Sequence, residues 1–218
     1  MMTTIKLVVF DWDGTLLDST LHIANCIQRT CHSLQLPIPD SERAKFVIGL
    51  GLIESIRYVV PTLKSSQVPE FIEVFRSYYL PSEPQLSLFS GARELLDLLN
   101  QRHKILAVAT GKPRQGLDRS LLNNQLEGVF SFTRCADESR AKPHPEMLEY
   151  LMDRAGVYPH ETLMVGDTTH DLQMAHYAKA HAIAVSYGAH SVNLLKKEPH
   201  IFMAQSLIEL NHWFSASL

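Results

Sequence analysis

Short apolar runs alternate with stretches of helical spacing over most of the chain. Five runs have the length of strands buried in a sheet. They cover residues 7–10, 104–109, 129–135, 162–165 and 182–186. Apolar residues at helical spacing follow in five further stretches. These cover residues 92–102, 113–125, 145–155, 172–179 and 206–214. Strands separated by single helices predict right-handed crossovers and a parallel sheet, so the pattern indicates an α/β fold.

The segment 17–88 departs from this rhythm, because its periodicity is helical throughout. A helix is predicted to start at Ser19 or Thr20, and three more follow. They cover residues 41–47, 53–60 and 69–80, with a glycine-containing break at 48–52. We therefore predict an α/β core formed by 1–16 and 89–218. The all-helical insertion at 17–88 follows the first strand directly, so it is expected to form a lid over the carboxyl end of the sheet.

Composition and charge exclude several functional classes. The chain has 218 residues, of which 45% are hydrophobic and 20% charged, as is ordinary for globular proteins. Its net charge of −3 gives no basic field for nucleic acid. No apolar run approaches the ~20 residues that cross a bilayer, so no membrane partner is expected. The apolar run near the N-terminus is too short for a signal peptide. The sequence makes no prediction of oligomeric state.

Cysteine usage points to a reducing compartment. Cys26, Cys31 and Cys135 form no C-x-x-C motif, and their odd number argues against a disulfide framework. We expect three reduced thiols, mostly buried, and a cytoplasmic protein.

The first apolar run ends in two carboxylates. Alternation along extended backbone places Asp11 and Asp13 on one side, while Trp12 turns into the core. Gly14 gives the backbone freedom to leave the strand sharply. Asp and Gly also favour turns by propensity alone, so this motif needs support from the rest of the chain.

That support comes from the ends of other strands. One run ends at Thr110, and a later one ends at Asp167, with Asp171 four residues further on. Lys142 lies in a loop that Pro143 and Pro145 fix. Because ligands of open α/β sheets bind at the carboxyl ends of the strands, we expect these side chains to meet Asp11.

The chemistry of such a group favours phosphoryl transfer. Clustered carboxylates repel one another unless a cation intervenes, and oxygen ligands favour Mg²⁺ over Zn²⁺. A threonine hydroxyl and a lysine ammonium suit phosphoryl oxygens, which need donors and positive charge. Asp11 could then attack phosphorus to give an aspartyl-phosphate, with Asp13 as the acid and base.

Four motifs in this order resemble those of the haloacid dehalogenase superfamily. They are D-W-D-G-T at 11–15, Thr110 after a strand, Lys142-Pro143, and Gly166-Asp167-x-x-x-Asp171. The insertion at 17–88 is similar to the type-1 cap of that superfamily. Within it, the chain looks closest to phosphoglycolate phosphatase-like enzymes. The resemblance implies a Rossmann-like parallel core with a helical cap. It also implies a Mg²⁺-dependent phosphatase of small phosphorylated metabolites, with phosphoglycolate as the leading substrate.

The resemblance also assigns roles to the acidic residues. It implies that Asp11 is the nucleophile and a metal ligand, and that Asp13 is the acid/base and offers its backbone carbonyl to the metal. Asp167 and Asp171 would be further metal ligands. An Asp at position 13 separates phosphate transfer from dehalogenation within the superfamily.

The same resemblance places Thr110 and Lys142 among the catalytic residues that hold the phosphoryl oxygens, together with the backbone of Gly111. Gly111 stands where many relatives have Asn, which could alter a polar contact. Lys112 is left open between substrate contact and a solvated side chain. We expect neither His144 nor His170 to bind the metal, since Mg²⁺ disfavours imidazole.

Some alternatives remain open at this stage. A β-phosphoglucomutase-like phosphotransferase would use the same motifs, and a non-catalytic phospho-ligand-binding protein could share the fold. In the insertion, Gly49 and Gly51 could form a loop that touches the substrate. Arg43 and Arg57 could bind an anionic substrate tail or lie on a solvated helix face.

Overall fold

A six-stranded parallel sheet lies at the centre of the protein, which confirms the predicted α/β class. The computed structural model describes residues 5–217. The strands run in the order β3-β2-β1-β4-β5-β6. Their bounds are β1 (Leu7–Phe10), β2 (Ile105–Thr110), β3 (Phe132–Cys135), β4 (Thr162–Gly166), β5 (His181–Val185) and β6 (Phe202–Ala204). The edge strand β6 was not predicted, because three residues are too few to show a periodicity.

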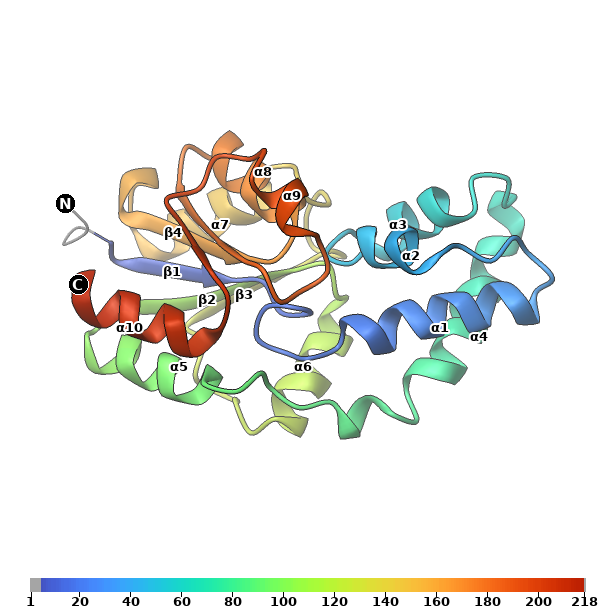
Figure 1. Ribbon diagram of the computed structural model, residues 1–218, viewed down its shortest axis with the longest axis horizontal. Helices are drawn as coiled ribbons and strands as arrows, with labels where there is room; N and C mark the ends of the chain where they lie inside the picture. The colour runs from blue at the N-terminus through green and yellow to red at the C-terminus, as the bar shows by residue number, and fades with distance from the viewer. Residues whose placement is uncertain (1–4, 218) are drawn as a thin grey trace.

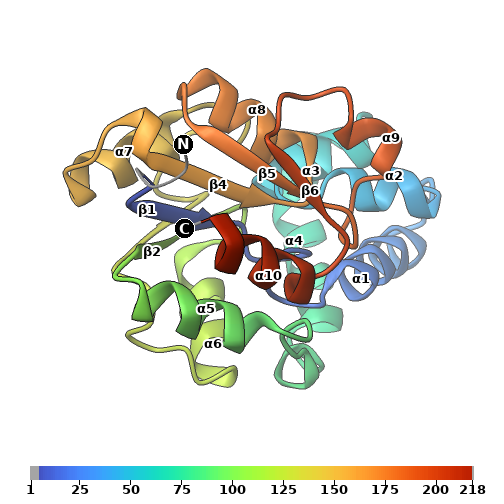
Figure 2. The same cartoon turned by 60° about the vertical axis from the view of Figure 1, so that its left-hand side comes forward.

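Helices cover both faces of the sheet (Figures 1 and 2). On one face lie α7 (Glu146–Ala155), α8 (Thr169–Tyr177) and α9 (Val192–Leu195). The short helix η3 (Pro159–Glu161) directly precedes β4 in the chain. On the other face lie α5 (Ala92–Gln101), α6 (Arg114–Asn123) and α10 (Leu207–Ser217). The three-layer arrangement buries the centre of the sheet on both sides, which explains why β1 is an uninterrupted apolar run and why β2 and β4 are mostly apolar.

The central strand β1 sets the geometry of the site. Val8 and Phe10 pack on one face and Leu7 and Val9 on the other, all fully buried. Its two neighbours are in register with it, since Phe10 is level with Val108 of β2 and Val165 of β4. The residues that follow these three strands therefore come together at one edge.

Trp12 turns away from that edge, as predicted. Its side chain is fully buried and its Nε1 donates a hydrogen bond to Ser120 Oγ at 2.8 Å. The indole thus holds the strand end against α6 and leaves the carboxylates on the opposite side.

The segment between β1 and α5 contains only helices, and we call residues 17–88 the helical insertion. Its helices are α1 (Thr20–Ser33), α2 (Ser41–Phe46), α3 (Leu52–Val59), η1 (Ser65–Gln67), α4 (Val68–Tyr79) and η2 (Glu83–Gln85). They have an apolar cluster of their own, which includes Ile27, Ile56 and Phe71. Figure 1 shows the insertion beyond the carboxyl ends of the strands.

The two chain crossings between sheet and insertion lie side by side. Leu17 and Leu88 form an antiparallel bridge. Asp18 N–H donates to Ser87 O, and Phe89 N–H donates to Leu16 O, both at 2.9 Å. The insertion is therefore joined to the sheet through one narrow, hydrogen-bonded pair of segments.

Two further expectations concern helices and thiols. Within residues 5–217 no helix combines the length and the hydropathy needed to cross a bilayer. Cys26, Cys31 and Cys135 are free and buried, as predicted.

Candidate active site

Three carboxylates from different elements meet at the carboxyl end of the sheet. Asp11 follows β1, Asp167 follows β4, and Asp171 lies in the first turn of α8. One oxygen atom of each lies within 4.8 Å of the others, and all three side chains are fully buried. The structure thus brings together the acidic residues that the motifs predicted.

Lys142 joins this group from its loop. Its Nζ lies 2.8 Å from Asp11 Oδ1 and 2.6 Å from Asp171 Oδ1, and the side chain is buried. Burial opposes the charge on Lys142, but the Asp11 and Asp171 carboxylates outweigh it and raise the pKa of the ammonium group. Lys142 is therefore a fixed positive charge beside Asp11.

The cluster carries more negative charge than Lys142 can balance. Burial raises the pKa of Asp11 well above its usual range, with Lys142 acting in the opposite direction. Burial, followed by the charge of Asp171, raises the pKa of Asp167 to about 7. Within residues 5–217 no hydrogen-bond donor reaches Asp11 Oδ2. Three carboxylates facing one ammonium group, with one oxygen lacking a donor, fit a divalent cation.

The Asp167 carboxylate is held in place by the loops around it. Thr15 Oγ1 donates to Asp167 Oδ1 and Ala189 N–H to Asp167 Oδ2, each at 2.7 Å. Gly14 has a φ of +86°, and a Cβ there would collide with the Asp167 carboxylate. The close backbone approach orients Asp167 toward the other two acids.

Asp171 also has a second role, in capping the first turn of α8. Thr168 is the N-cap of α8, and its side chain and that of Asp171 form a capping box. Thr168 N–H donates to Asp171 Oδ2 at 3.1 Å, and Thr168 Oγ1 donates to the same atom at 2.7 Å. This cap starts α8 at Thr169, three residues before the predicted position.

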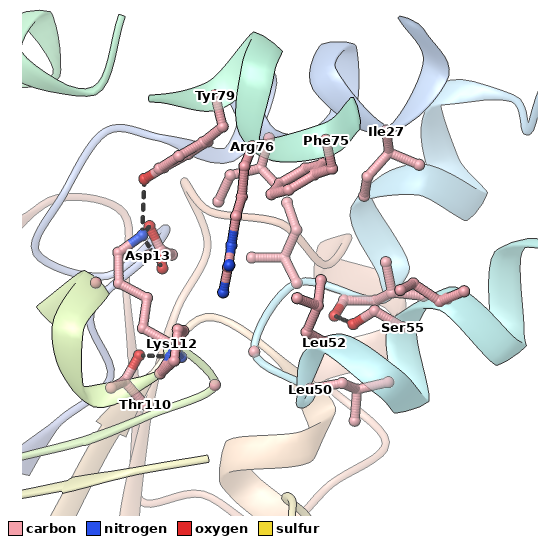
Figure 3. A pocket seen from close by; sticks show the side chains of 18 of the residues that line it. Asp13, Ile27, Leu50, Leu52, Ser55, Phe75, Arg76, Tyr79, Thr110 and Lys112 are labelled. Atoms are coloured by element: carbon pink, nitrogen blue, oxygen red, sulfur yellow. Dashed lines mark hydrogen bonds and ion pairs between the residues drawn. The ribbon is translucent and has the colours of Figure 1, made fainter. Parts of the chain in front are cut away.

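Asp13 lies outside the carboxylate cluster and has its own partners. Ser19 Oγ donates to Asp13 Oδ1 at 2.7 Å, and Lys112 Nζ lies 3.0 Å from both carboxylate oxygens. Lys112 Nζ also donates to Tyr79 Oη of α4 at 2.7 Å, as the dashed lines in Figure 3 show.

Lys112 is therefore a buried site residue, and the solvated alternative is wrong. Only 9% of its surface is exposed, and Asp13 and Tyr79 outweigh burial to raise its pKa. Burial also raises the pKa of the Tyr79 hydroxyl to about 12. The sequence did hold a signal for this position of Lys112. Residues two apart on extended backbone point to the same side, and Lys112 is two residues after Thr110.

The insertion lies directly over the strand ends. Thr110 is buried at the end of β2, and its Oγ1 accepts a hydrogen bond from Lys112 N–H at 3.1 Å. A Cβ on Gly111 would collide with the backbone carbonyls of Gly49 and Leu50 in the insertion. A glycine at position 111 therefore allows the backbone of the insertion to approach the end of β2 closely.

Gly49 also approaches the acidic cluster. Its φ is +91°, and a Cβ there would lie 3.7 Å from Asp11 Oδ2. Gly51 is the N-cap residue of α3, and a Cβ there would lie 3.6 Å from the Cβ of Ala141, which precedes Lys142. The loop at 48–51 thus covers the nucleophile candidate, where the sequence indicated a flexible break with two glycines that could reach the substrate.

His170 has a structural role that was not predicted. Its Nε2 donates to the carbonyl of Phe46 in α2 at 2.9 Å, and His190 Nε2 donates to the same oxygen at 3.0 Å. Thr169 N–H donates to His190 Nδ1 at 3.0 Å, which assigns the proton of that ring to Nε2. The Phe46 ring stacks on His190 with centroids 4.8 Å apart. We call Phe46, His170 and His190 the latch between insertion and core.

Other candidates lie elsewhere. His144 contacts Arg140 and is not among the cluster-forming residues of the described chain. Arg43 donates to Tyr58 O at 2.7 Å on an exposed surface, and neither Arg43 nor Arg57 lines the cavity that the described residues form next to Asp11. Arg76 of α4 lines it instead.

Comparisons with known proteins agree with this geometry. The family of haloacid dehalogenase-like hydrolases matches residues 8–185. The chain is 36% identical over 204 residues to the probable phosphatase IndB of Dickeya dadantii, covering 90% of this chain and 88% of that protein. It is 34% identical to a phosphoglycolate phosphatase of Aliivibrio fischeri, covering 86% and 87%.

A solved structure gives the same result. The crystal structure of a predicted phosphoglycolate phosphatase from Haemophilus somnus superposes with a TM-score of 0.85 at 25% identity, covering 98% of this chain and all of that chain. The chain belongs to the haloacid dehalogenase-like hydrolase family and is an enzyme of that family. The resemblance stated from the four motifs is confirmed.

Proposed function

We propose that this protein is a Mg²⁺-dependent phosphatase that hydrolyses phosphate monoesters of small metabolites through an aspartyl-phosphate on Asp11. The observation that carries the proposal is the position of Lys142 Nζ, 2.8 Å from Asp11 Oδ1, while Asp11 Oδ2 has no donor in the described chain. One oxygen of the nucleophile is thereby oriented and the other is left available for reaction or for a metal. The names of the relatives make phosphoglycolate the first substrate to test.

The residues divide the work into two half-reactions. In the first, Asp11 attacks phosphorus while Asp13 gives a proton to the leaving oxygen. In the second, Asp13 takes a proton from the water that attacks the phosphoryl group, and Asp11 is released. Lys142 and Thr110, with the backbone N–H of Gly111, are placed to bind the phosphoryl oxygens.

Asp11, Asp167 and Asp171 would hold the Mg²⁺, with the backbone carbonyl of Asp13. The cluster offers only oxygen ligands, which suits a hard divalent ion. The ion would supply charge neutralisation between two anions, the carboxylate nucleophile and the phosphate ester.

We further propose that residues 1–16 and 89–218 are a catalytic core and that the helical insertion is a cap that opens for substrate. Closure is supported by three sets of contacts: the loop at 48–51 over Asp11, the latch, and the hydrogen bond from Lys112 to Tyr79. Three free buried thiols suit a reducing compartment, and we place the activity in the cytoplasm.

The test is phosphate release by purified protein from phosphoglycolate and from other phosphorylated metabolites, with Mg²⁺ and with EDTA. Asp11→Asn should lower the rate at least about a thousandfold, because an amide is a poor nucleophile. Asp18→Asn is the matched control, since Asp18 is an exposed aspartate a few residues further on. Near-normal hydrolysis by Asp11→Asn would contradict the covalent route. An isomerised sugar phosphate without net phosphate release would indicate a phosphotransferase instead.

A further inference from the structure

The cavity next to Asp11 is much larger than a phosphoryl group needs. It encloses about 680 Å³ between the strand ends and the helical insertion. Volumes of about 300–1,000 Å³ are typical of pockets that bind ligands of drug size. The leaving group of phosphoglycolate is glycolate, a two-carbon acid that would occupy a small part of this space.

The two ends of the cavity differ in chemistry. Asp11, Asp13, Thr110 and Lys112 line the end at the sheet. The far end lies inside the insertion and is walled by α1, α3 and α4. Its apolar lining is formed by Ile23, Ile27, Leu52, Ile56, Phe71 and Phe75. Water there finds almost no polar partner, so an apolar group that replaces it would be favoured.

One charged side chain projects between the two ends. Figure 3 shows Arg76 extending from α4 into the cavity, beside Tyr79 and Phe75. No carboxylate of residues 5–217 lies within ion-pairing distance of its guanidinium group, unlike Lys112 or Arg119 nearby. A guanidinium in this position suits a carboxylate or another acceptor on the substrate.

We propose that the substrate is a phosphate monoester whose leaving group joins a bulky apolar or aromatic part, seated between α1, α3 and α4, to a carboxylate that Arg76 binds. This inference rests on the proposed phosphatase function and specifies its substrate class. The phosphoryl group lies at the sheet, and the apolar part reaches into the insertion. Glycolate would supply the carboxylate but leave the apolar end unfilled.

A matched series of esters tests the size requirement. Phosphoglycolate, phospholactate and the phosphate ester of 3-phenyllactate carry the same carboxylate next to the ester carbon and differ only in the added methyl or benzyl group. The wild-type kcat/KM should rise along the series, by about a hundredfold overall, because apolar groups in such pockets discriminate strongly. Phosphoglycolate as the best substrate of the three would overturn the inference.

Two variants locate the effect. Leu52→Trp fills part of the apolar end, so it should lower kcat/KM for the phenyllactate ester at least about tenfold more than for phosphoglycolate. Ile53→Trp is the matched control, because Ile53 is exposed and does not line the cavity. Equal losses on both substrates with Leu52→Trp would overturn the placement of the apolar group.

Arg76→Met tests the carboxylate contact. It should lower kcat/KM for the phenyllactate ester about tenfold or more relative to its effect on 2-phenylethyl phosphate, which has no carboxylate. Arg57→Met, an exposed arginine of α3 outside the cavity, is the control. Equal effects of Arg76→Met on the two esters would contradict the assignment of Arg76.

Acetyl phosphate separates the two proposals. Hydrolysis of this small, reactive acyl phosphate with Mg²⁺, together with no preference for bulk among the phosphate esters, would overturn the substrate class alone. No hydrolysis of any ester would overturn the phosphatase function and this inference with it. Melting curves of all variants confirm that each protein is folded.

Discussion

The two sides of the active site are built in opposite ways. On the core side, charged groups are fully buried and tied to one another, as Lys142 is to Asp11 and Asp171. On the insertion side, the walls are mostly apolar apart from Arg76, and a smaller set of contacts joins them to the core. These include the latch, the loop over Gly111, the Tyr79 hydroxyl and the ion pair between Glu83 and Arg119.

This difference suggests a division of roles, in which the core side carries out the reaction and the insertion side selects the substrate. The core groups follow directly from strand ends in fixed register, so their positions change little with the rest of the chain. In the proposed function, the insertion moves as a unit about its two crossings, and its apolar lining sets which leaving group fits. Substitutions on the core side should therefore abolish the reaction, and those on the insertion side should adjust it.

Asp167→Asn should give the largest effect of the three variants that test this contrast. The pKa of Asp167 is raised to about 7, so its charge is unfavourable in the metal-free fold at pH 8. We expect the metal-free melting temperature to stay equal or rise, since Asn can still pair with Thr15 and Ala189. Activity should fall about a hundredfold or more, and the Mg²⁺-dependent rise in melting temperature should disappear.

Melting curves with EDTA and with Mg²⁺ measure this, alongside phosphate release. Asp18→Asn should keep the wild-type response to Mg²⁺. A variant at position 167 that Mg²⁺ stabilises as strongly as the wild type would show that Asp167 is not a metal ligand.

Lys112→Met should have an intermediate effect, because Lys112 belongs to the core but is shared with the insertion. Loss of its contact with Asp13 should lower kcat about ten- to hundredfold, since the acid/base would lose its fixed position. Tyr79→Phe removes only the hydroxyl contact and should cost less. Lys196→Met, at an exposed lysine, is the control. Equal rates for Lys112→Met and the wild type would show that Lys112 does not contribute to the reaction.

Phe46→Ala should have the smallest effect of the three. It removes the ring that stacks on His190, and such aromatic pairs contribute about 0.5–1.5 kcal/mol. A less populated closed state should raise KM about two- to tenfold and change kcat little. Tyr58→Ala is the matched control, because Tyr58 stacks on the other side of Phe46 within the insertion. A large fall in kcat with KM unchanged would contradict a latch.

The same contrast explains what the sequence could predict. Asp11, Thr110 and Asp167 were expected to meet because each stands at the end of a strand and the carboxyl ends of parallel strands converge. The fold class followed from alternating strand and helix periods. Strand β6 was missed because it is short and lies at the sheet edge.

Residues of the insertion were less predictable. Arg76 and Tyr79 lie on one helix, and helical periodicity does not indicate that the Tyr79 hydroxyl reaches Lys112. Arg43 of α2 and Arg57 of α3 looked equally suited to bind an anion. The sequence does not show how α2, α3 and α4 are oriented against the core, and this orientation decides which arginine faces the cavity. His170 was expected not to bind the metal, and no pattern indicated its contact with Phe46, which joins residues 124 positions apart.

The most direct test of the account is to trap the phosphorylated enzyme. Wild-type protein is mixed with a ³²P-labelled substrate and Mg²⁺, quenched with acid during the first turnovers, and reduced with borohydride, which converts an acyl phosphate of aspartate to homoserine. The account predicts ³²P on the quenched protein and homoserine at position 11 after reduction, with neither in Asp11→Asn. Steady turnover with no labelled protein, or with the label on another residue, would contradict it.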